Sequence, residues 1–176
     1  MSENKLKLEL VKENDPILTE ITEEWDFEKD GDPGDLIKEM TRLMFLHGGI
    51  GLSANQCGVN KRIFIMGNEE ELIVCINPKI ISLSDQRILG EEGCLSFPGL
   101  WLKVKRPASA NVTYQTITGI EKQEEMMGFK ARVFLHEFDH LMGITFTERV
   151  SDFSLKLAKE RRARYLKKLK KFASPK

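Results

Sequence analysis

His136-Glu137-Phe138-Asp139-His140 lies within a long apolar segment, Glu124–Met142, which stops at Gly143. A helix drawn through this segment carries apolar residues on almost every side, which predicts a helix buried inside the protein. Glycine is common just after the end of a helix, so Gly143 agrees with this boundary. We therefore expect the fold to be built around this helix, with the polar pentapeptide enclosed by the core.

The spacing of the two histidines predicts a metal centre. Residues four apart share one face of a helix, so the imidazoles of His136 and His140 can reach the same cation. Glu137 follows the first histidine and can contact water held by that cation. The pattern HExxH thus indicates two metal ligands and a general acid/base.

A tetrahedral catalytic ion needs a third protein ligand and leaves one position open. Three residues compete for this role in the sequence. Glu160 lies 20 residues after His140, Cys94 lies in Glu92-Gly93-Cys94-Leu95-Ser96, and Cys57 follows a glycine-rich segment. For Cys57 and Cys75, burial as small apolar side chains is the simpler interpretation.

The remaining elements are predicted from local periodicity. Lys5–Val11 alternates leucine with charged residues, which is typical of a half-buried strand, and a helix with an apolar stripe starts at Asp32-Pro33. That stripe contains Leu36, Ile37, Met40, Leu43 and Met44. Short β-rich runs occupy Ile63–Met66, Leu72–Ile76, Ile80–Leu83, Trp101–Val104 and Ala110–Ile117. We expect a single α+β domain with β-sheets packed around the buried central helix and a basic C-terminal helix.

Composition narrows the class of protein. The chain has 176 residues, 41% of them hydrophobic and 31% charged, which suits one globular core. No apolar run approaches the roughly 18 residues of a membrane span, and the N-terminus lacks the pattern of a secretory signal. Three cysteines do not provide a framework of several disulfides. We therefore expect a protein of a bacterial-type cytosol with no membrane partner.

Charge divides the chain into two parts. Residues 1–150 contain 17 basic and 25 acidic residues, a net charge of −8, whereas residues 151–176 contain 10 and 2, a net charge of +8. A helix is predicted over Ser154–Phe172 with its apolar residues on one side, and one interpretation is that this side packs on the domain; the residues are Leu155, Ala158, Tyr165, Leu169 and Phe172. We expect a catalytic domain over 1–153, extended by a basic helix over 154–176 whose partner is anionic. The acidic segment Glu20–Asp35 is expected to be a solvated loop without a chemical role.

Three segments together resemble the peptide deformylase family. Gly49–Gln56 is similar to its GxGLAAxQ motif, Glu92–Ser96 to its EGCLS motif, and His136–Gly143 to its HExDHLxG motif. The resemblance extends over most of the chain, including an early turn at Asp15–Leu18 and the segment Val104–Arg106 after the cysteine motif. The sequence departs from the family pattern at three positions. Ser53, Cys57 and Leu135 stand where the family usually has alanine, an aliphatic residue and glutamine, respectively.

The resemblance implies specific roles. Cys94, His136 and His140 would hold one divalent metal ion, with Fe²⁺ as the native ion and Zn²⁺, Ni²⁺ or Co²⁺ as substitutes. Glu137 would carry the proton, and Gln56 with the Leu95 backbone N–H would stabilise the oxyanion. Gly51, which lies in the same motif as Gln56, would also belong to the catalytic site. The implied enzyme is a hydrolase that removes the formyl group from the N-terminal formyl-methionine of new polypeptides and releases formate.

The apolar residues near these motifs are candidates for binding the methionine side chain: Gly49, Ile50, Leu52, Phe129 and Val133. The implied partners are nascent formyl-Met polypeptides and, through the basic helix, the ribosome, with the enzyme a monomer. The motifs also predict an ion pair between Glu92 and Arg106.

Two alternatives stay open at the level of the residues alone. A zinc endopeptidase would use Glu160 as its third ligand. A non-enzymatic RNA- or ribosome-binding protein with a structural metal would use the basic tail.

Overall fold

A computed structural model describes residues 6–173 and the side chains of residues 6–169. Its elements follow the order η1 (Pro16–Thr19), α1 (Gly34–Leu46), β1 (Gly51–Ser53), η2 (Ala54–Cys57), β2 (Ile63–Gly67), β3 (Leu72–Leu83), β4 (Arg87–Glu92), β5 (Leu102–Pro107), β6 (Ser109–Gln115), β7 (Glu121–Met127), α2 (Gly128–Leu141), η3 (Phe146–Arg149) and α3 (Asp152–Ala173). The α+β class and the single-domain architecture predicted from the sequence are confirmed.

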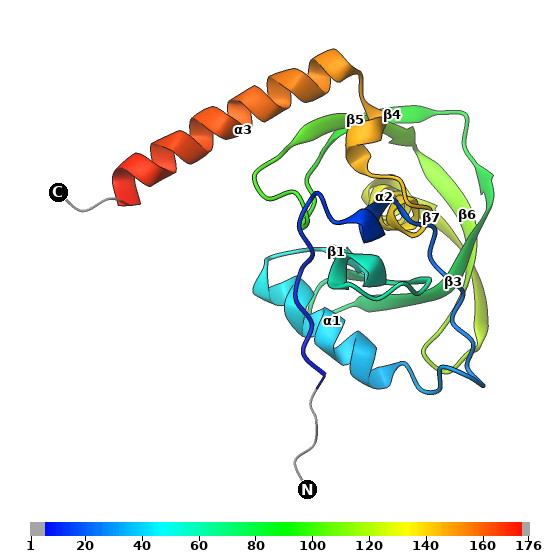
Figure 1. Ribbon diagram of the computed structural model, residues 1–176. Coiled ribbons are helices and arrows are strands. Elements are labelled where there is room, and N and C mark those ends of the chain that lie inside the picture. The colour runs from blue at the N-terminus through cyan, green and yellow to red at the C-terminus, as the bar shows by residue number, and fades with distance from the viewer. Residues whose placement is uncertain (1–5, 174–176) are drawn as a thin grey trace, which may run out of the picture.

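Two antiparallel sheets surround α2. The larger sheet has the strand order β1-β2-β3-β6-β7, and the smaller one consists of β4 and β5. Figure 1 shows α2 nearly end-on at the centre, with the large sheet curving around it, β4 and β5 above it, and α1 on the outer side of β1 and β2. The pentapeptide on α2 is therefore enclosed, as predicted: His136, Glu137, Asp139 and His140 are all buried.

The first helix follows its sequence pattern. All five residues of the predicted apolar stripe of α1 are buried, and they pack with β1 and β2 in one hydrophobic cluster. Asp32 accepts a hydrogen bond from the backbone N–H of Gly34, while Pro33 takes the cap position rather than the first turn. The helix ends at Leu46, two residues before Gly48, whose φ of 66° is a conformation that favours glycine.

The predicted central helix begins too early. Its first residues belong to β7, which pairs with β6 from Ser109↔Met127 to Gln115↔Glu121. Gly128, with φ of 56°, then turns the chain into α2. The residues of β7 favour helices in isolation, but pairing with a neighbouring strand overrides this local preference.

Other strand boundaries also differ from the prediction. Leu72–Ile76 and Ile80–Leu83 are one strand, β3, with register shifts between Ile76 and Ser82. Trp101–Val104 is displaced to Leu102–Pro107, and β1, β4 and β7 were not predicted as strands.

The predicted N-terminal strand is wrong for its described residues, 6–11, which belong to no strand. Isolated contacts anchor them instead, including the hydrogen bonds from Leu8 N–H to the Glu39 carboxylate and from Val11 N–H to the Gln56 carbonyl. Lys5 lies outside the described residues.

The C-terminal helix packs on the domain only near its start, so the interpretation of a fully packed apolar side is wrong. In α3, Ala158 is buried and Leu155 is half-buried, but Tyr165 and Leu169 are exposed because the helix extends away from the domain (Figure 1). The side chain of Phe172 lies outside the described residues. Arg162 makes a contact with the body of the protein, donating hydrogen bonds to both carboxylate oxygens of Glu13 at 2.6 and 3.1 Å.

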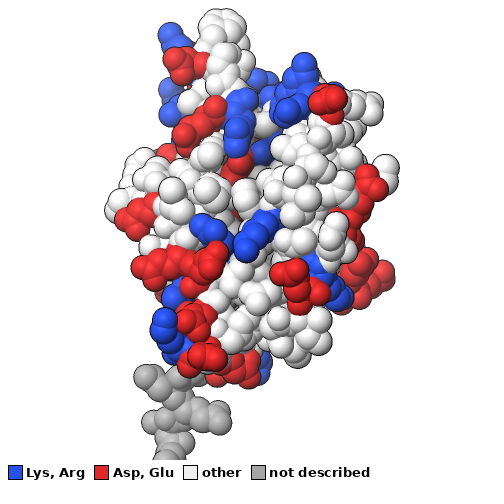
Figure 2. Space-filling view, turned by 90° about the vertical axis from the view of Figure 1, so that its right-hand side faces the viewer, with Lys and Arg blue, Asp and Glu red and all other residues white. Residues whose placement is uncertain are grey.

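Acidic side chains are frequent in the lower half of the face in Figure 2, whereas several basic side chains gather towards the top.

The acidic segment 20–35 is anchored to the domain more firmly than a free loop. Trp25 packs against the core around α1, and Lys61 pairs with Asp30 at 2.8 Å.

Candidate metal centre and substrate cavity

Three donor atoms converge at the middle of α2. The ligand atoms of Cys94, His136 and His140 all lie within 4.8 Å of one another, and the Cys94 sulfur is 3.2 Å from His140 Nε2. The two histidines come from α2, whereas Cys94 lies two residues beyond the end of β4. In the part of the chain that the structure describes, this is the one cluster of three or more such donors close enough to hold an ion.

Glu92 orients the first histidine. His136 Nδ1 lies 3.0 Å from Glu92 Oε2, so a proton on Nδ1 leaves Nε2 free for a metal. Arg106 donates to both oxygens of the same carboxylate at 3.0 Å, which confirms the predicted ion pair, and Arg132 adds a hydrogen bond at 2.7 Å. Burial opposes the charge on Glu92, but the hydrogen bonds from His136 and Arg106 and the Arg106 charge outweigh it and lower the pKa of Glu92 to about 2.

His140 is suited to act as a neutral ligand. Burial, followed by the positive charges of its surroundings, holds the pKa of His140 well below its usual value. Its backbone carbonyl accepts a hydrogen bond from Asn55 at 2.7 Å, which ties this part of α2 to η2. One thiolate and two neutral imidazoles form a donor set that fits Zn²⁺ or Fe²⁺.

Glu137 is buried beside this cluster. Its Oε2 has no hydrogen-bond partner among the described residues, which is unusual for a buried carboxylate. Burial raises the pKa of Glu137 to about 7, although a positive charge on His136 acts in the opposite direction. A carboxyl group with this pKa can both accept and release a proton near neutral pH.

Gln56 contacts the third candidate ligand, Cys94. Its Nε2 donates to the Cys94 sulfur and to Ser96 Oγ, each at 3.2 Å. Ser53 fixes the orientation of this amide. Its backbone N–H and its hydroxyl both donate to Gln56 Oε1, each at 3.0 Å. The departure from the family pattern at Ser53 therefore adds a hydrogen-bonding group next to Gln56.

A cavity of about 570 Å³ opens onto Cys94 and His136, two of the three candidate metal ligands. Four of the predicted pocket residues line it, together with Gly51 and Leu95; the four are Gly49, Ile50, Phe129 and Val133. Leu52 does not, and this prediction is wrong: Leu52 lies within β1 and packs in the core, where it is completely buried.

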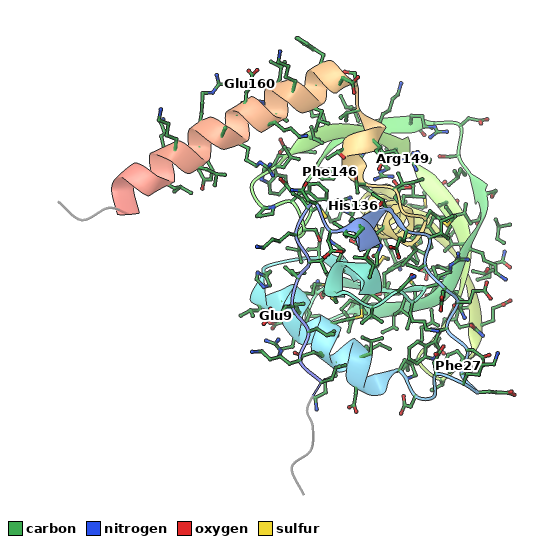
Figure 3. All side chains as sticks on the ribbon, viewed as in Figure 1. Glu9, Phe27, His136, Phe146, Arg149 and Glu160 are labelled. Carbon is green, nitrogen blue, oxygen red and sulfur yellow. The ribbon has the colours of Figure 1, made fainter. Side chains whose placement is uncertain are left out.

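The competing ligands are excluded by position. Glu160 is exposed on α3, and Figure 3 shows it well away from His136. Cys57 and Cys75 are buried thiols outside the donor cluster, and burial raises the pKa of Cys57 to about 12. Both remain protonated at neutral pH, in agreement with a packing role.

Sequence reasoning missed two residues near the site. Trp101 lines the cavity, and its ring packs on Gly93, where an added β-carbon would lie 3.0 Å from the ring. Arg132 projects from α2 one turn before His136 and contacts Glu92. An arginine among the apolar residues that directly precede His136 was the signal that could have identified it.

Two imidazoles, a thiolate and a buried glutamate beside an apolar cavity are typical of a metal-dependent hydrolase. The model of the polypeptide deformylase family matches residues 7–156. The peptide deformylase of Thermotoga neapolitana is 38% identical over 125 residues, which cover 71% of this chain and 76% of the relative. The chloroplastic peptide deformylase 1B of Oryza sativa subsp. japonica is 43% identical over 121 residues, 66% of this chain and 45% of the rice protein.

Solved structures agree with these matches. A peptide deformylase from Synechococcus elongatus, crystallised in complex with actinonin, superimposes with a TM-score of 0.83 and 32% identity over 92% of each chain. Peptide deformylase 1B from Arabidopsis thaliana gives a TM-score of 0.80 with 35% identity, over 94% of each chain. The chain belongs to the polypeptide deformylase family. It is an enzyme that removes the formyl group from newly made polypeptides.

No helix within residues 6–173 is long and apolar enough to cross a membrane.

Proposed function

We propose that Cys94, His136 and His140 hold one divalent metal ion and that Glu137 is the general acid/base of deformylation. The observation that carries this proposal is the buried Glu137 carboxylate, one oxygen of which has no hydrogen-bond partner among the described residues, beside three converging metal donors. When bound, a divalent ion supplies Lewis-acid polarisation and makes water more acidic.

The remaining chemistry is assigned to the side chains of the protein. Glu137 takes a proton from the water that attacks the formyl carbon, and it returns a proton to the nitrogen as the C–N bond breaks. The products are formate and a free amino terminus. The pKa of about 7 for Glu137 is compatible with both transfers.

Gln56 and the backbone N–H of Leu95 are proposed to stabilise the developing oxyanion. Gln56 Nε2 is held at the edge of the site by its contact with Cys94, and Leu95 is the next residue along the chain. Loss of one oxyanion donor typically lowers the rate by about 10² to 10³. Gly51 contributes by leaving room for Glu137, since it has no side chain.

The methionine side chain is proposed to bind in the cavity beside His136. Gly49, Ile50, Phe129 and Val133 supply small or apolar surfaces there. Ile50 and Phe129, which line this cavity, are both exposed, and a bound substrate would cover them. A neutral apolar side chain matches this lining.

The native metal is proposed to be Fe²⁺, with Zn²⁺, Ni²⁺ or Co²⁺ able to substitute. The experiment is reconstitution of chelator-treated protein with each ion without oxygen, followed by assays of metal content and formate release from formyl-Met-Ala. Equal binding of several ions, with the highest turnover for Fe²⁺, is expected. Full activity of the chelated protein would contradict metal dependence.

Residues 1–153 and 154–176 are proposed to act as a catalytic domain and its basic extension, respectively. Beyond Arg162, α3 presents basic and apolar side chains to solvent, including Arg164, Lys167 and Lys168. An anionic surface of the ribosome, from which the substrate emerges, is the proposed target of this helix. We further propose that the enzyme acts as a monomer in the cytosol.

A further inference from the structure

The donors of the candidate metal centre come from two elements that are not adjacent in sequence. His136 and His140 lie on α2, whereas Cys94 follows β4 of the small sheet. A site of this kind needs a rigid connection between the two elements, because metal ligands function only when they are held within about 0.5 Å of the correct geometry.

Arg132 provides contacts between these elements. Its Nη2 donates to the carbonyl of Ile88 at 2.7 Å, and its Nη1 lies 2.9 Å from the carbonyl of Val104 and 2.7 Å from Glu92 Oε1. One guanidinium on α2 thus contacts both β4 and β5. It is also nearly buried, with 8% of the residue exposed, so these hydrogen bonds are largely shielded from water.

The neighbouring strand is shaped to accept this side chain. A β-carbon at Gly90 would lie 2.7 Å from Arg132 Cζ and 2.8 Å from its Nε, closer than atoms can approach without displacement. Gly90 lies on β4 and does not have a positive φ, so its backbone conformation does not itself demand glycine. Glycine is needed at this position because the Arg132 guanidinium occupies the space that a side chain would fill.

We propose that Arg132 is a positioning residue for the metal centre, which holds the β4–β5 hairpin against α2. Through the hairpin it sets the position of Cys94 relative to the two histidines, and through Glu92 it sets the orientation of the His136 ring. This inference rests on the proposed role of Cys94, His136 and His140 as ligands.

Position in the sequence supports this role. Arg132 lies one helical turn before His136 on the same face of α2, and Glu92 lies two residues before Cys94. Displacement of the guanidinium therefore acts on both parts of the ligand set at once. Arg106 keeps its own contact with both Glu92 oxygens, so Arg132 can be tested without removing the whole network.

The test compares Arg132→Met with Lys130→Met in the full chain loaded with Co²⁺. Lys130 lies on the same helix but pairs with Glu124, away from the hairpin, and serves as the matched control. We expect Co²⁺ affinity to fall about 10- to 100-fold in Arg132→Met, with an altered thiolate-to-cobalt absorption band. At saturating metal, kcat for formyl-Met-Ala should fall while KM stays within about twofold.

Gly90→Ala provides an independent test that keeps the arginine. It should reproduce the loss of Co²⁺ affinity and the spectral change in the wild-type background, but add little in the Arg132→Met background, because the displaced group is then absent. If Arg132→Met does not fold, Gly90→Ala alone decides, with Lys130→Met again as reference.

Wild-type Co²⁺ affinity and spectrum in both variants would overturn the proposal. Wild-type protein without a thiolate–cobalt band would instead show that the ligand assignment itself is wrong, so the two failures are distinguishable.

Discussion

The Glu137 carboxylate lies directly against Gly51: a β-carbon at Gly51 would be 2.3 Å from Glu137 Oε1. Gly51 is the first residue of β1, and Glu137 comes from α2, so this contact joins the large sheet to the central helix. The missing side chain at Gly51 explains how a buried carboxylate fits next to the metal donors.

Gly51→Ala should therefore displace Glu137 and lower kcat by about 10² or more, within the range expected for loss of a general acid/base. Among the described residues, no hydrogen bond joins Gly51 to the candidate metal ligands, so metal content should stay near that of wild type. Metal analysis and formate assays on the purified variant check both statements. Unchanged kcat would show that the carboxylate position is not critical.

Cys94→Ala should lose the metal, whereas Cys57→Ala and Cys75→Ala should retain it. Only Cys94 lies within reach of both histidines, while the other two thiols are buried in apolar clusters. The measurement is metal content per chain after gel filtration. Retention of a full equivalent by Cys94→Ala would exclude the thiolate as a ligand.

Arg106→Ala should reduce the free energy of unfolding by about 3 to 5 kcal/mol, because it removes a buried cation that pairs with two buried carboxylates. Arg106 pairs with Glu92 and also with Asp139 at 2.5 Å, and all three side chains are at least nine-tenths buried. Lys29→Ala is the control, since it breaks the exposed pair with Asp26 and should cost about 0 to 1 kcal/mol. Equal urea-unfolding curves for the two variants would contradict the buried network.

Deletion of residues 163–176 should leave hydrolysis of a short formyl-Met peptide intact and abolish salt-sensitive binding to ribosomes. This boundary keeps Arg162 and its ion pair with Glu13, so the helix remains attached to the domain. Binding through phosphate contacts should weaken steeply with salt. Sedimentation with ribosomes over a salt series gives the answer, and equal affinity with and without the tail would remove the proposed role of α3.

Local patterns were enough to predict the features that depend on neighbouring residues in the chain. The stripe of α1 is buried because its spacing is helical, and the pair His136 and His140 converges because four residues make about one turn. The proposed ligand Cys94 was different. It required the resemblance to a family, since nothing local indicates that the end of β4 meets the middle of α2.

The errors share a physical cause, which is tertiary context. Glu121–Met127 contains helix-favouring residues but is held as a strand by β6. Leu52 and Ile50 looked equivalent in the sequence, yet Leu52 lies within β1 and is buried in the core, whereas Ile50 precedes the strand and lies at the cavity. Tyr165 and Leu169 fit an apolar stripe, but the domain does not extend far enough to cover them.

The most direct test of the account is formate release from formyl-Met-Ala by wild type and Glu137→Gln, each carrying one metal ion per chain. Glu137 is assigned as the proton carrier and not as a ligand, so we predict equal metal content and a kcat about 10² to 10⁴ lower in the variant. Comparable turnover by the two metal-loaded proteins, or a folded Glu137→Gln variant without metal, would contradict the central claim.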